Sequence, residues 1–465
     1  MLNVKNIYKK NPYIYLPLRR FIKSRAYISA LELFNTSEKW SASEIDAWQF
    51  SQVKNIVEYA FDHVPYYHNL YKEAGYIQGD LESWREFEKL PYIEKNHVKN
   101  NLSLFTSDEI SKIKHTICHT GGSTDKPMEF YQDKEIMERE SAFFNYYWSK
   151  YGYNSGERCV ILRGHNVADI NKKRFYEYDK IRNYKVFDSK YITKIEYLPF
   201  YDKQIKDFHA RVLQAYPSSL YNFAKTYKES GINPPKFDLI FLGSENTYND
   251  QIDFIKDVFC AKRVIYHYGF TECAAIALKY ADCNRLGFFP QYGRTELIDE
   301  NGQQVKTADG LGEIVATTFS KSTPFIRYKT EDCAISSDYK SNDFMHNCLA
   351  VERIEGRLHE FIVTMDSRLV SLCTVAGAHM PSLSEVGDMQ YEQQQKGRLI
   401  IKVTSKNGTN ISTITYENIK RDFRAVFADS LEVEIHQIES LERTDRGKKI
   451  LLNQRINLDK IRNEK

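Results

Sequence analysis

Short apolar runs of strand length alternate with helical patterns through the middle of this chain. The runs cover Arg158–Arg163, Phe237–Leu242 and Val264–His267. In the segments around them, apolar residues recur every three or four positions, which is typical of amphipathic helices. These expected helices cover Lys134–Lys150, Tyr201–Ala215 and Asp250–Phe259. Because strands separated by helices usually pair in parallel, the alternation predicts an α/β fold with sites at the carboxyl ends of the strands.

The segment before this core is helical in pattern. Apolar spacing runs from Ser43 to Gly75, with Ser43 as the expected N-cap, a break at Pro65, and Gly75 as the stop signal.

The segments after the core change pattern twice. Arg294–Phe319 has the pattern of strand, turn and strand, so we expect an antiparallel β subdomain there. After Arg357 the pattern becomes short mixed strands with one helix near Tyr416–Phe427. The sequence therefore predicts a large domain over residues 1–357, with mixed and parallel sheets and a β subdomain, and a small α+β domain over residues 358–465.

Composition excludes several classes of protein. The 465 residues provide for roughly three domain-equivalents. Lys and Arg number 65 against 62 acids, so the strong basic excess typical of nucleic-acid binders is missing. We find no apolar run near 18 residues, the length that predicts a membrane-spanning helix. The 8 cysteines form no CxxC pair, which argues against a zinc ribbon or a disulfide framework and favours reduced thiols in a cytoplasmic protein.

The first 30 residues contain basic and aromatic side chains but no acid. Basic residues near an anionic lipid surface contribute about 1 kcal/mol each to binding. This arm is therefore a candidate contact with a membrane or with a polysaccharide-assembly partner. The alternative is an arm that folds over its own domain.

A loop rich in glycine and hydroxyl residues is the strongest local motif. It reads His119-Thr120-Gly121-Gly122-Ser123-Thr124-Asp125-Lys126-Pro127. Glycines let backbone amides approach an anion closely, hydroxyls add donors, and the lysine adds charge. This chemistry suits a polyphosphate, although the spacing is not that of a Walker loop. A solvated connection is the alternative for such a turn on its own.

Further motifs follow this loop in a fixed order. They are Gly243-Ser244-Glu245, Tyr268-Gly269-Phe270-Thr271-Glu272, Arg327-Tyr328-Lys329-Thr330-Glu331-Asp332, Gly356-Arg357-Leu358-His359-Glu360 and Arg443-Thr444-Asp445-Arg446-Gly447-Lys448. With them, nearly the whole chain resembles the adenylate-forming superfamily of acyl-CoA synthetases and ligases. Within it, the chain is similar to the phenylacetate–coenzyme A ligase family and its CapK-type capsule-biosynthesis relatives.

The resemblance implies a role for each motif. Thr120, Gly121, Gly122, Ser123, Thr124 and Lys126 would hold the β- and γ-phosphates of ATP, and Gly243, Ser244, Glu245, Tyr268 and Gly269 would line the adenine. Thr271 would contact the α-phosphate, Glu272 would hold Mg²⁺, and Asp332 would take the ribose hydroxyls with Arg357 beside them. Lys448 would bridge the carboxylate substrate and the α-phosphate, and His359 would stand at the hinge between the domains.

Elementary electrostatics agrees with this assignment. Attack of a carboxylate on the α-phosphate brings two anions together, and a cation placed there lowers the barrier by several kcal/mol. The alternatives are that Glu272 is an ordinary acid at a helix N-terminus, that Asp332 is a turn residue, and that Lys448 is a solvated charge.

The chain departs from the family pattern at three positions. Asp125 and Glu331 stand where the family usually has glycine, and His359 stands where the hinge is usually Asp or Lys. A carboxylate 4 Å from a phosphate charge costs about 1 kcal/mol in water and about 4 kcal/mol at an effective dielectric near 20. If position 331 needs a positive φ, its side chain costs about 1–2 kcal/mol.

Together these observations predict an ATP-dependent ligase that adenylates a carboxylic acid and releases pyrophosphate. The resemblance implies coenzyme A as the usual acyl acceptor, with an amine in surface-polysaccharide synthesis as another. A catalytically degenerate nucleotide-binding scaffold of a polysaccharide-assembly complex is the alternative, which Asp125 and Glu331 favour.

Overall fold

The computed structural model describes residues 24–465 except 121–127, 166, 168–173, 189–190, 193, 246–248, 282, 342, 358–360, 368, 372–384, 407, 443–449, 457–460 and 462–465. Within this part of the chain the strands are β1 (His115–His119), β2 (Glu129–Asp133), β3 (Cys159–His165), β4 (Tyr176–Asp179), β5 (Tyr184–Asp188), β6 (Val212–Ala215), β7 (Leu239–Gly243), β8 (Arg263–Gly269), β9 (Ile276–Lys279), β10 (Leu286–Phe288), β11 (Arg294–Ile298), β12 (Leu311–Thr317), β13 (Tyr328–Ser336), β14 (Leu349–Arg357), β15 (Phe361–Val363), β16 (Leu369–Ser371), β17 (Val386–Gln395), β18 (Arg398–Ser405), β19 (Glu432–Gln437) and β20 (Leu452–Gln454).

The α-helices in the same residues are α3 (Arg25–Ser37), α4 (Ala42–His63), α5 (Pro65–Glu73), α6 (Trp84–Phe87), α7 (Lys95–Asn100), α8 (Leu102–Phe105), α9 (Lys134–Ser149), α10 (Leu198–Lys206), α11 (Pro217–Ser230), α12 (Asn249–Val258) and α14 (Thr413–Phe427). Short 3₁₀ turns are η1 (Ile110–Lys112), η3 (Ile195–Tyr197) and η5 (Ala428–Ser430). None of the described helices is long and apolar enough to cross a membrane.

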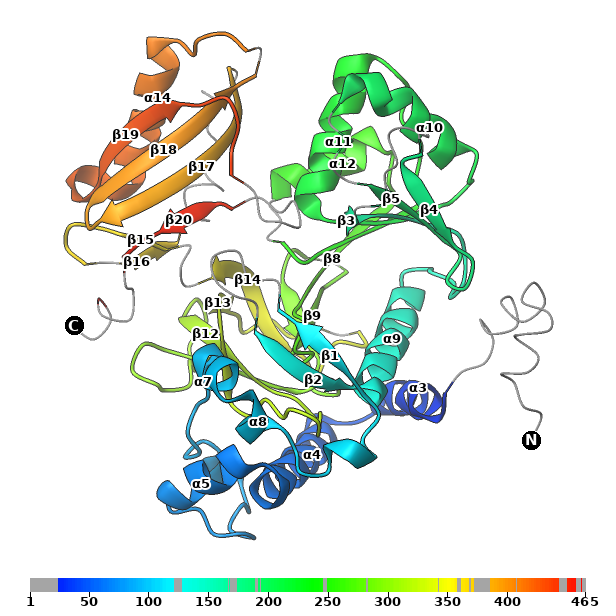
Figure 1. The fold of residues 1–465 in the computed structure, drawn as a ribbon, viewed down its shortest axis with the longest axis vertical. Helices are drawn as coiled ribbons and strands as arrows, with labels where there is room; N and C mark the ends of the chain where they lie inside the picture. The colour runs from blue at the N-terminus through cyan, green and yellow to red at the C-terminus, as the bar shows by residue number, and fades with distance from the viewer. Residues whose placement is uncertain are drawn as a thin grey trace. The chain divides into compact units, whose positions relative to one another are not determined.

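The largest sheet has 12 strands in the order β11-β12-β13-β14-β10-β9-β8-β7-β6-β3-β5-β4. Its parallel part pairs β5 with β3, β3 with β6, β6 with β7, and β7 with β8. Helices α11 and α12 pack together beside these strands (Figure 1). The alternation in the sequence therefore did specify a parallel α/β core, in which α11 follows β6 and α12 follows β7.

The chain divides into two compact units. Unit 1 holds residues 1–296, 315–329 and 338–351, and unit 2 holds residues 297–314, 330–337 and 352–465. Unit 2 contains the four-stranded sheet β19-β18-β17-β20 and helix α14. The domain boundary predicted between residues 357 and 358 stays a prediction.

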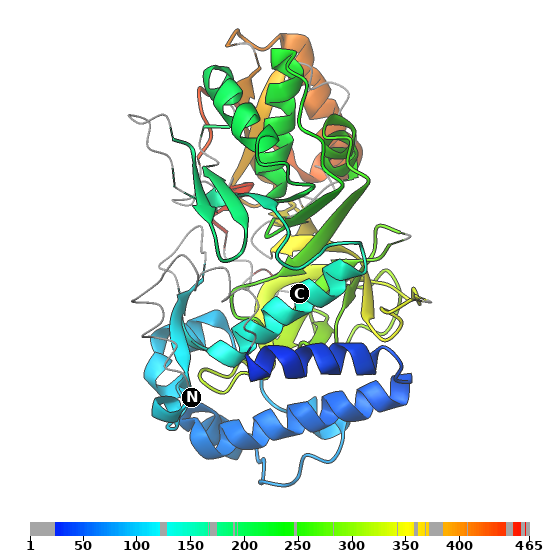
Figure 2. The same ribbon diagram turned by 90° about the vertical axis from the view of Figure 1, so that its right-hand side faces the viewer.

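The cores of unit 1 explain the high aromatic content. In one cluster Phe34 of α3 meets Phe143 and Tyr147 of α9, and Figure 2 shows these two helices running side by side. Tyrosines that are almost completely buried include Tyr67, Tyr71, Tyr147, Tyr153, Tyr201, Tyr227 and Tyr280. The aromatic residues therefore fill the interior, as expected.

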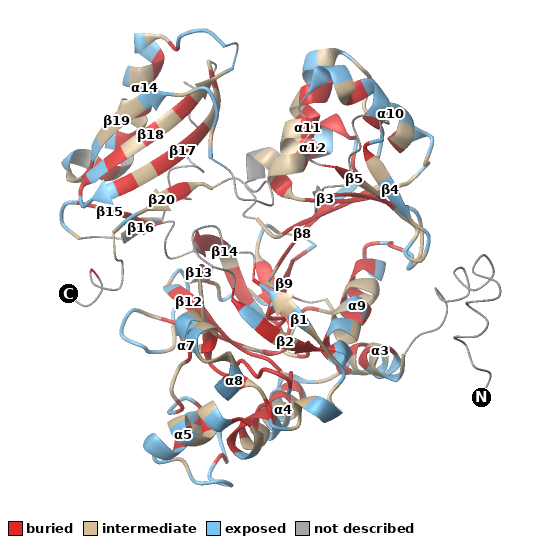
Figure 3. Ribbon diagram, in the orientation of Figure 1, coloured by how far each residue is buried: buried red, intermediate tan, exposed pale blue. Residues whose placement is uncertain are grey.

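The core of unit 2 lies between its sheet and α14. Along β18 the side chains of Leu399, Ile401 and Val403 are buried, and alternate positions are not, which Figure 3 shows as red and paler bands. These residues pack with Ile419 and Phe423 of α14. The period of two along the strand therefore places one face of the sheet against the helix.

Two expectations about local structure are wrong. The helix expected over Tyr201–Ala215 ends at Lys206, because His209 has a φ of +50° and the chain then enters β6, whose four residues are all buried. The N-cap of α4 is Ser41 and not Ser43, because only Ser41 has a glutamate at the third helical position to complete a capping box.

Other expected elements are present. Helix α4 is followed by α5 at Pro65, and Gly75 follows α5 with a φ of +78°. The Arg294–Phe319 segment forms β11 and β12, which are continuous with the 12-stranded sheet and do not form a sheet of their own.

Candidate active site

The carboxyl ends of the parallel strands bring two of the sequence motifs together in unit 1. Strands β7 and β8 pair in parallel with Gly243 opposite His267. The Gly243–Glu245 motif therefore lies beside the end of β8, where Tyr268 and Gly269 follow. This juxtaposition agrees with the expectation that a ligand site forms at this edge of the sheet.

Gly243 leaves room for a buried imidazole. A Cβ atom built on Gly243 would lie 2.4 Å from two atoms of the His267 ring. The ring contacts Phe144 edge-on, with a centroid distance of 5.0 Å. Burial lowers the pKa of His267 to about 3, so the imidazole stays neutral near pH 7. Packing against His267 therefore accounts for a glycine at position 243 without reference to a ligand.

Replacing Gly243 with alanine is expected to destabilise unit 1 by about 1–3 kcal/mol, because the new methyl overlaps the ring of His267, which is buried and packed against Phe144. Gly269→Ala is the matched control, since its Cβ would meet nothing closer than 3.6 Å. The readout is urea unfolding followed by tryptophan fluorescence. The double variant Gly243→Ala/His267→Ala should recover part of the loss, and strict additivity of the two single changes would contradict this packing role.

Ser244 and Glu245 connect this edge to its neighbours. Ser244 adopts a left-handed φ of +68° and accepts a hydrogen bond from Nη2 of Arg163 at 2.9 Å. Oε2 of Glu245 accepts from the backbone N–H of Ser218 at 2.9 Å, in the first turn of α11. Because the N-cap residue of α11, Tyr216, makes no side-chain cap, Glu245 serves as the capping carboxylate. Its side chain is therefore engaged with the helix.

The Thr271–Cys273 turn follows β8 and positions the carboxylate predicted to bind metal. Glu272 is 8% exposed, and its Oε1 accepts a hydrogen bond from the Tyr328 hydroxyl at 3.0 Å. Nε2 of Gln132 donates to the carbonyl of Thr271 at 2.8 Å. Residues from β2 and β13 thus hold the turn from two sides. The alternative that Glu272 is an acid at a helix N-terminus is wrong, because no helix begins there.

Thr120 closes the base of the glycine-rich loop. Its N–H donates to the carbonyl of Met128 at 2.9 Å, and its Oγ1 accepts from the N–H of Met128 at 3.0 Å. Strands β1 and β2 pair antiparallel directly below it, from His119 opposite Glu129. The hairpin therefore brackets the loop, whose predicted ligands Gly121, Gly122, Ser123, Thr124 and Lys126 lie outside the described residues together with Asp125.

Glu331 adopts the strained backbone that a glycine would relieve. Its φ is +64°, and its N–H donates to Oε1 of Glu313 at 3.2 Å. Such a conformation costs a non-glycine residue about 1–2 kcal/mol. Position 331 therefore has the positive φ at which the sequence analysis expected a side chain to be costly. The next residue, Asp332, is half-buried, and its N–H donates to Oγ1 of Thr330 at 3.2 Å.

The predicted site residues fall into both units. Thr120, Glu272 and the adenine-lining motifs are in unit 1, whereas Asp332 and Arg357 are in unit 2. His359 and Lys448 lie outside the described residues. The structure thus places the adenine-lining motifs at the strand ends, Glu272 in the adjoining turn and Thr120 at the end of the β1–β2 hairpin, and the roles assigned to all these residues stay predictions.

The residues that support the carboxyl-end edge of the sheet were not predicted from the sequence. Arg163 is a charged residue at the end of the apolar run Arg158–Arg163, and this position could have indicated a role at the strand ends. Tyr328 and Gln132 gave no separate signal, because their partners Glu272 and Thr271 are remote in sequence and become neighbours only through the fold.

The chemistry of the donor set fits Mg²⁺. This ion commonly takes one or two carboxylates and completes its shell with water and substrate phosphates. Glu272 supplies one carboxylate, whose Oε1 accepts a hydrogen bond from the Tyr328 hydroxyl. The described residues contain no group of three or more His, Cys, Asp or Glu side chains that would form an all-protein metal site.

Comparison with known proteins agrees with this geometry. CapK of Staphylococcus aureus is 21% identical over 470 residues, which span 97% of this chain and 98% of CapK. A crystal structure of 2-hydroxyisobutyryl-CoA ligase, in the postadenylation state with an acyl-AMP, superposes with a TM-score of 0.70 at 16% identity and covers 92% of this chain and 94% of that one. The chain has the adenylate-forming ligase fold.

A ligase relative supports the same assignment. Phenylacetate-coenzyme A ligase of Pseudomonas putida is 21% identical over 309 residues, or 64% of this chain and 68% of that enzyme. No family model matches the chain. These relatives confirm the resemblance that the motifs indicated, and the adenylate-forming ligase fold confirms the α/β architecture expected from the sequence.

Proposed function

We propose that this protein is an ATP-dependent ligase that adenylates a carboxylic acid and passes the acyl group to an acceptor. The observation that supports it most is Glu272, a buried carboxylate that follows β8 and is held by Tyr328. Similarity to CapK over 97% of the chain, to phenylacetate-coenzyme A ligase over 64%, and to the structure of 2-hydroxyisobutyryl-CoA ligase over 92% adds to this support.

The proposed reaction has two steps. A carboxylate oxygen of the acid attacks the α-phosphorus of ATP, an oxygen–phosphorus bond forms, and the bond to the bridging oxygen breaks so that pyrophosphate leaves. The acceptor then attacks the acyl carbon, the bond between that carbon and the AMP oxygen breaks, and AMP leaves. The acceptor's proton passes to solvent.

Each predicted residue has a part in binding or orientation. Glu272 would hold Mg²⁺, which neutralises phosphate charge when bound. Thr271 would contact the α-phosphate, and Asp332 has the two acceptor oxygens needed for the ribose hydroxyls. Lys448 would meet the charge that develops between the carboxylate and the α-phosphate.

The acceptor is proposed from the relatives. Two of them are named as coenzyme A ligases, which favours coenzyme A. The full-length similarity to CapK favours, as the alternative, an amine acceptor in surface-polysaccharide synthesis. The basic arm of residues 1–30, of which residues 1–23 lie outside the described residues, would then contact a membrane or an assembly partner.

The scaffold alternative is supported by one observation, the strained Glu331 beside the predicted ribose-binding residue. The two functions are separated by acid-dependent exchange of labelled pyrophosphate into ATP, measured with a panel of aryl and aliphatic acids. We expect exchange with at least one acid in the presence of Mg²⁺. Binding of ATP with no exchange for any acid would contradict the ligase and support the scaffold.

A further inference from the structure

Behind the Thr271–Cys273 turn lies a polar cluster that the proposed reaction does not use. Helix α9 carries the half-buried Glu140, and Oε1 of Glu140 accepts from the Cys273 thiol at 3.6 Å. The same oxygen accepts from the Tyr292 hydroxyl at 2.9 Å. Two donors from separate segments thus converge on one carboxylate oxygen.

Cys273 is an unusual residue for its position. Its φ is +51°, in the left-handed region where glycine has no steric cost and other residues pay about 1–2 kcal/mol. Its side chain is 5% exposed, and its carbonyl accepts from Oγ1 of Thr318 at 3.4 Å. Strained residues persist where surrounding contacts determine them. The thiol contact with Glu140 is one that a glycine at this position would lack.

The neighbouring backbone leaves the turn little freedom. A Cβ on Gly293, next to Tyr292, would lie 2.2 Å from the carbonyl oxygen of Ala274. Arg139, beside Glu140 on α9, donates from Nη2 to the carbonyl of Gln291 at 2.9 Å. Helix α9 therefore contacts both the Thr271–Cys273 turn, through Glu140, and the segment next to Gly293, through Arg139.

We propose that Glu140 is a positioning residue for the adenylation site. By anchoring Cys273, it holds the Thr271–Cys273 turn in the conformation that presents Glu272 to its ligand. The claim about the turn stands on contacts within unit 1, and only the identity of what Glu272 binds rests on the proposed function.

The test compares the reactivity of the Cys273 thiol in Glu140 variants of the full chain. A buried thiol reacts through local opening, so its alkylation rate reports how often the turn opens. N-ethylmaleimide labelling is followed at each cysteine by peptide mass spectrometry. In Glu140→Leu we expect Cys273 to react about tenfold faster, the change that follows from losing one hydrogen bond.

Matched variants separate positioning from general damage. Glu140→Gln keeps an acceptor oxygen and should label like the parent, and Glu135→Leu, at an exposed position of the same helix, should too. Tyr292→Phe leaves Glu140 in place and should raise the Cys273 rate by a smaller factor. If Glu140→Leu does not fold, the proposal is tested by the other two variants: Cys273 should label faster than in the parent in Tyr292→Phe and at the parent rate in Glu140→Gln.

A second readout connects the turn to its ligand. Calorimetry should show about tenfold weaker binding of ATP with Mg²⁺ to Glu140→Leu, and a smaller change for ATP with EDTA. Unchanged Cys273 labelling in Glu140→Leu, or an equal rise at Cys159 in β3, would overturn the proposal. Faster Cys273 labelling in a protein whose parent shows no pyrophosphate exchange would uphold the positioning role and refute only the ligase.

Discussion

Glu296→Ala is expected to lower the free energy of unfolding of unit 1 by about 3–5 kcal/mol. Glu296 and Arg327 form an ion pair with 0% and 3% side-chain exposure, and Nη2 of Arg327 lies 2.9 Å from Oε1 of Glu296. Removing the carboxylate leaves a guanidinium charge in the interior without its counter-ion. That uncompensated charge, more than the lost contact, is the source of the large cost.

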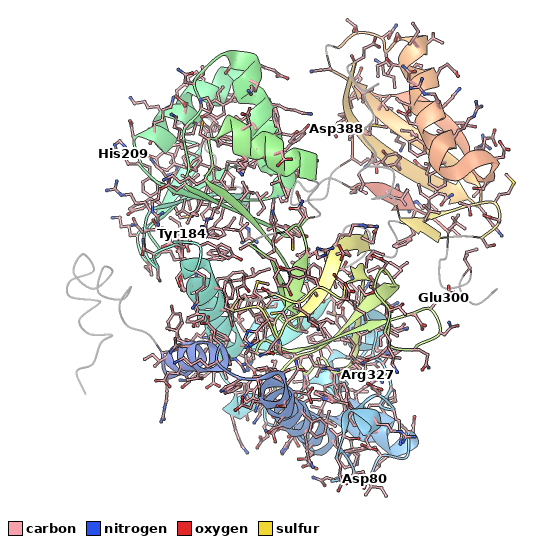
Figure 4. The ribbon with its side chains drawn as sticks, turned by 180° about the vertical axis from the view of Figure 1, so that it is seen from behind. Asp80, Tyr184, His209, Glu300, Arg327 and Asp388 are labelled. Atoms are coloured by element: carbon pink, nitrogen blue, oxygen red, sulfur yellow. The ribbon has the colours of Figure 1, made fainter. Side chains whose placement is uncertain are left out.

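Arg327 joins segments that are far apart in sequence. Its Nη1 donates to the carbonyls of Glu88 and Leu90, and its Nη2 donates to the Tyr92 hydroxyl at 2.8 Å. Its guanidinium also lies 4.1 Å from the centre of the Tyr92 ring. Figure 4 labels Arg327, and its contacts show that it ties the Leu90-Pro91 segment to the start of β13. The pair therefore stabilises the strand that carries Tyr328, the partner of Glu272.

Tryptophan fluorescence measures this loss selectively. The protein has 4 tryptophans, and all of them, at positions 40, 48, 84 and 148, lie in unit 1. Urea unfolding followed by this signal should shift to lower denaturant without a change in slope. Asp257→Ala is the control, because its pair with Lys228 is exposed and worth less than about 1 kcal/mol. A loss for Glu296→Ala no larger than the control would contradict the buried-pair interpretation.

Lys448→Ala is expected to reduce acid-dependent pyrophosphate exchange about 10²- to 10³-fold. The proposed role of this lysine is to stabilise charge that develops as the carboxylate attacks the α-phosphate, and a single such donor contributes on that scale. Because the interaction strengthens in the transition state, the loss should appear in kcat, with little change in the affinity for ATP.

The adjacent lysine provides the control for charge alone. Lys449→Ala removes the same charge one residue away and should keep exchange near the parent rate. Calorimetric binding of ATP to both variants checks that the nucleotide site is intact. Exchange that survives in Lys448→Ala would remove the proposed role of this lysine, and an equal loss in Lys449→Ala would show that the effect is one of general basic charge.

Local patterns were enough to predict the parallel core. The apolar runs that became β3, β7 and β8 are continuous and short, and these two properties distinguish them from the longer amphipathic helices between them. The same reasoning failed at β6, because a run of four buried residues after a helical segment has no periodicity of its own.

The site motifs could be identified in the sequence because folding alone rarely requires glycines, acids and hydroxyl residues in this order. The sequence by itself determined the strands β3, β7 and β8, the helices α4, α5, α9, α12 and α14, and the resemblance to adenylate-forming ligases. It also indicated that a positive φ at position 331 would be costly, and the structure has that φ.

Only the tertiary structure decided what holds those motifs in place. Tyr328 on Glu272, Glu140 behind Cys273, and Glu296 with Arg327 are pairs separated by 31 to 133 residues along the chain. No local pattern encodes such pairs, because a hydrogen bond depends on where two atoms lie after folding, whereas periodicity records only which face of one element is buried.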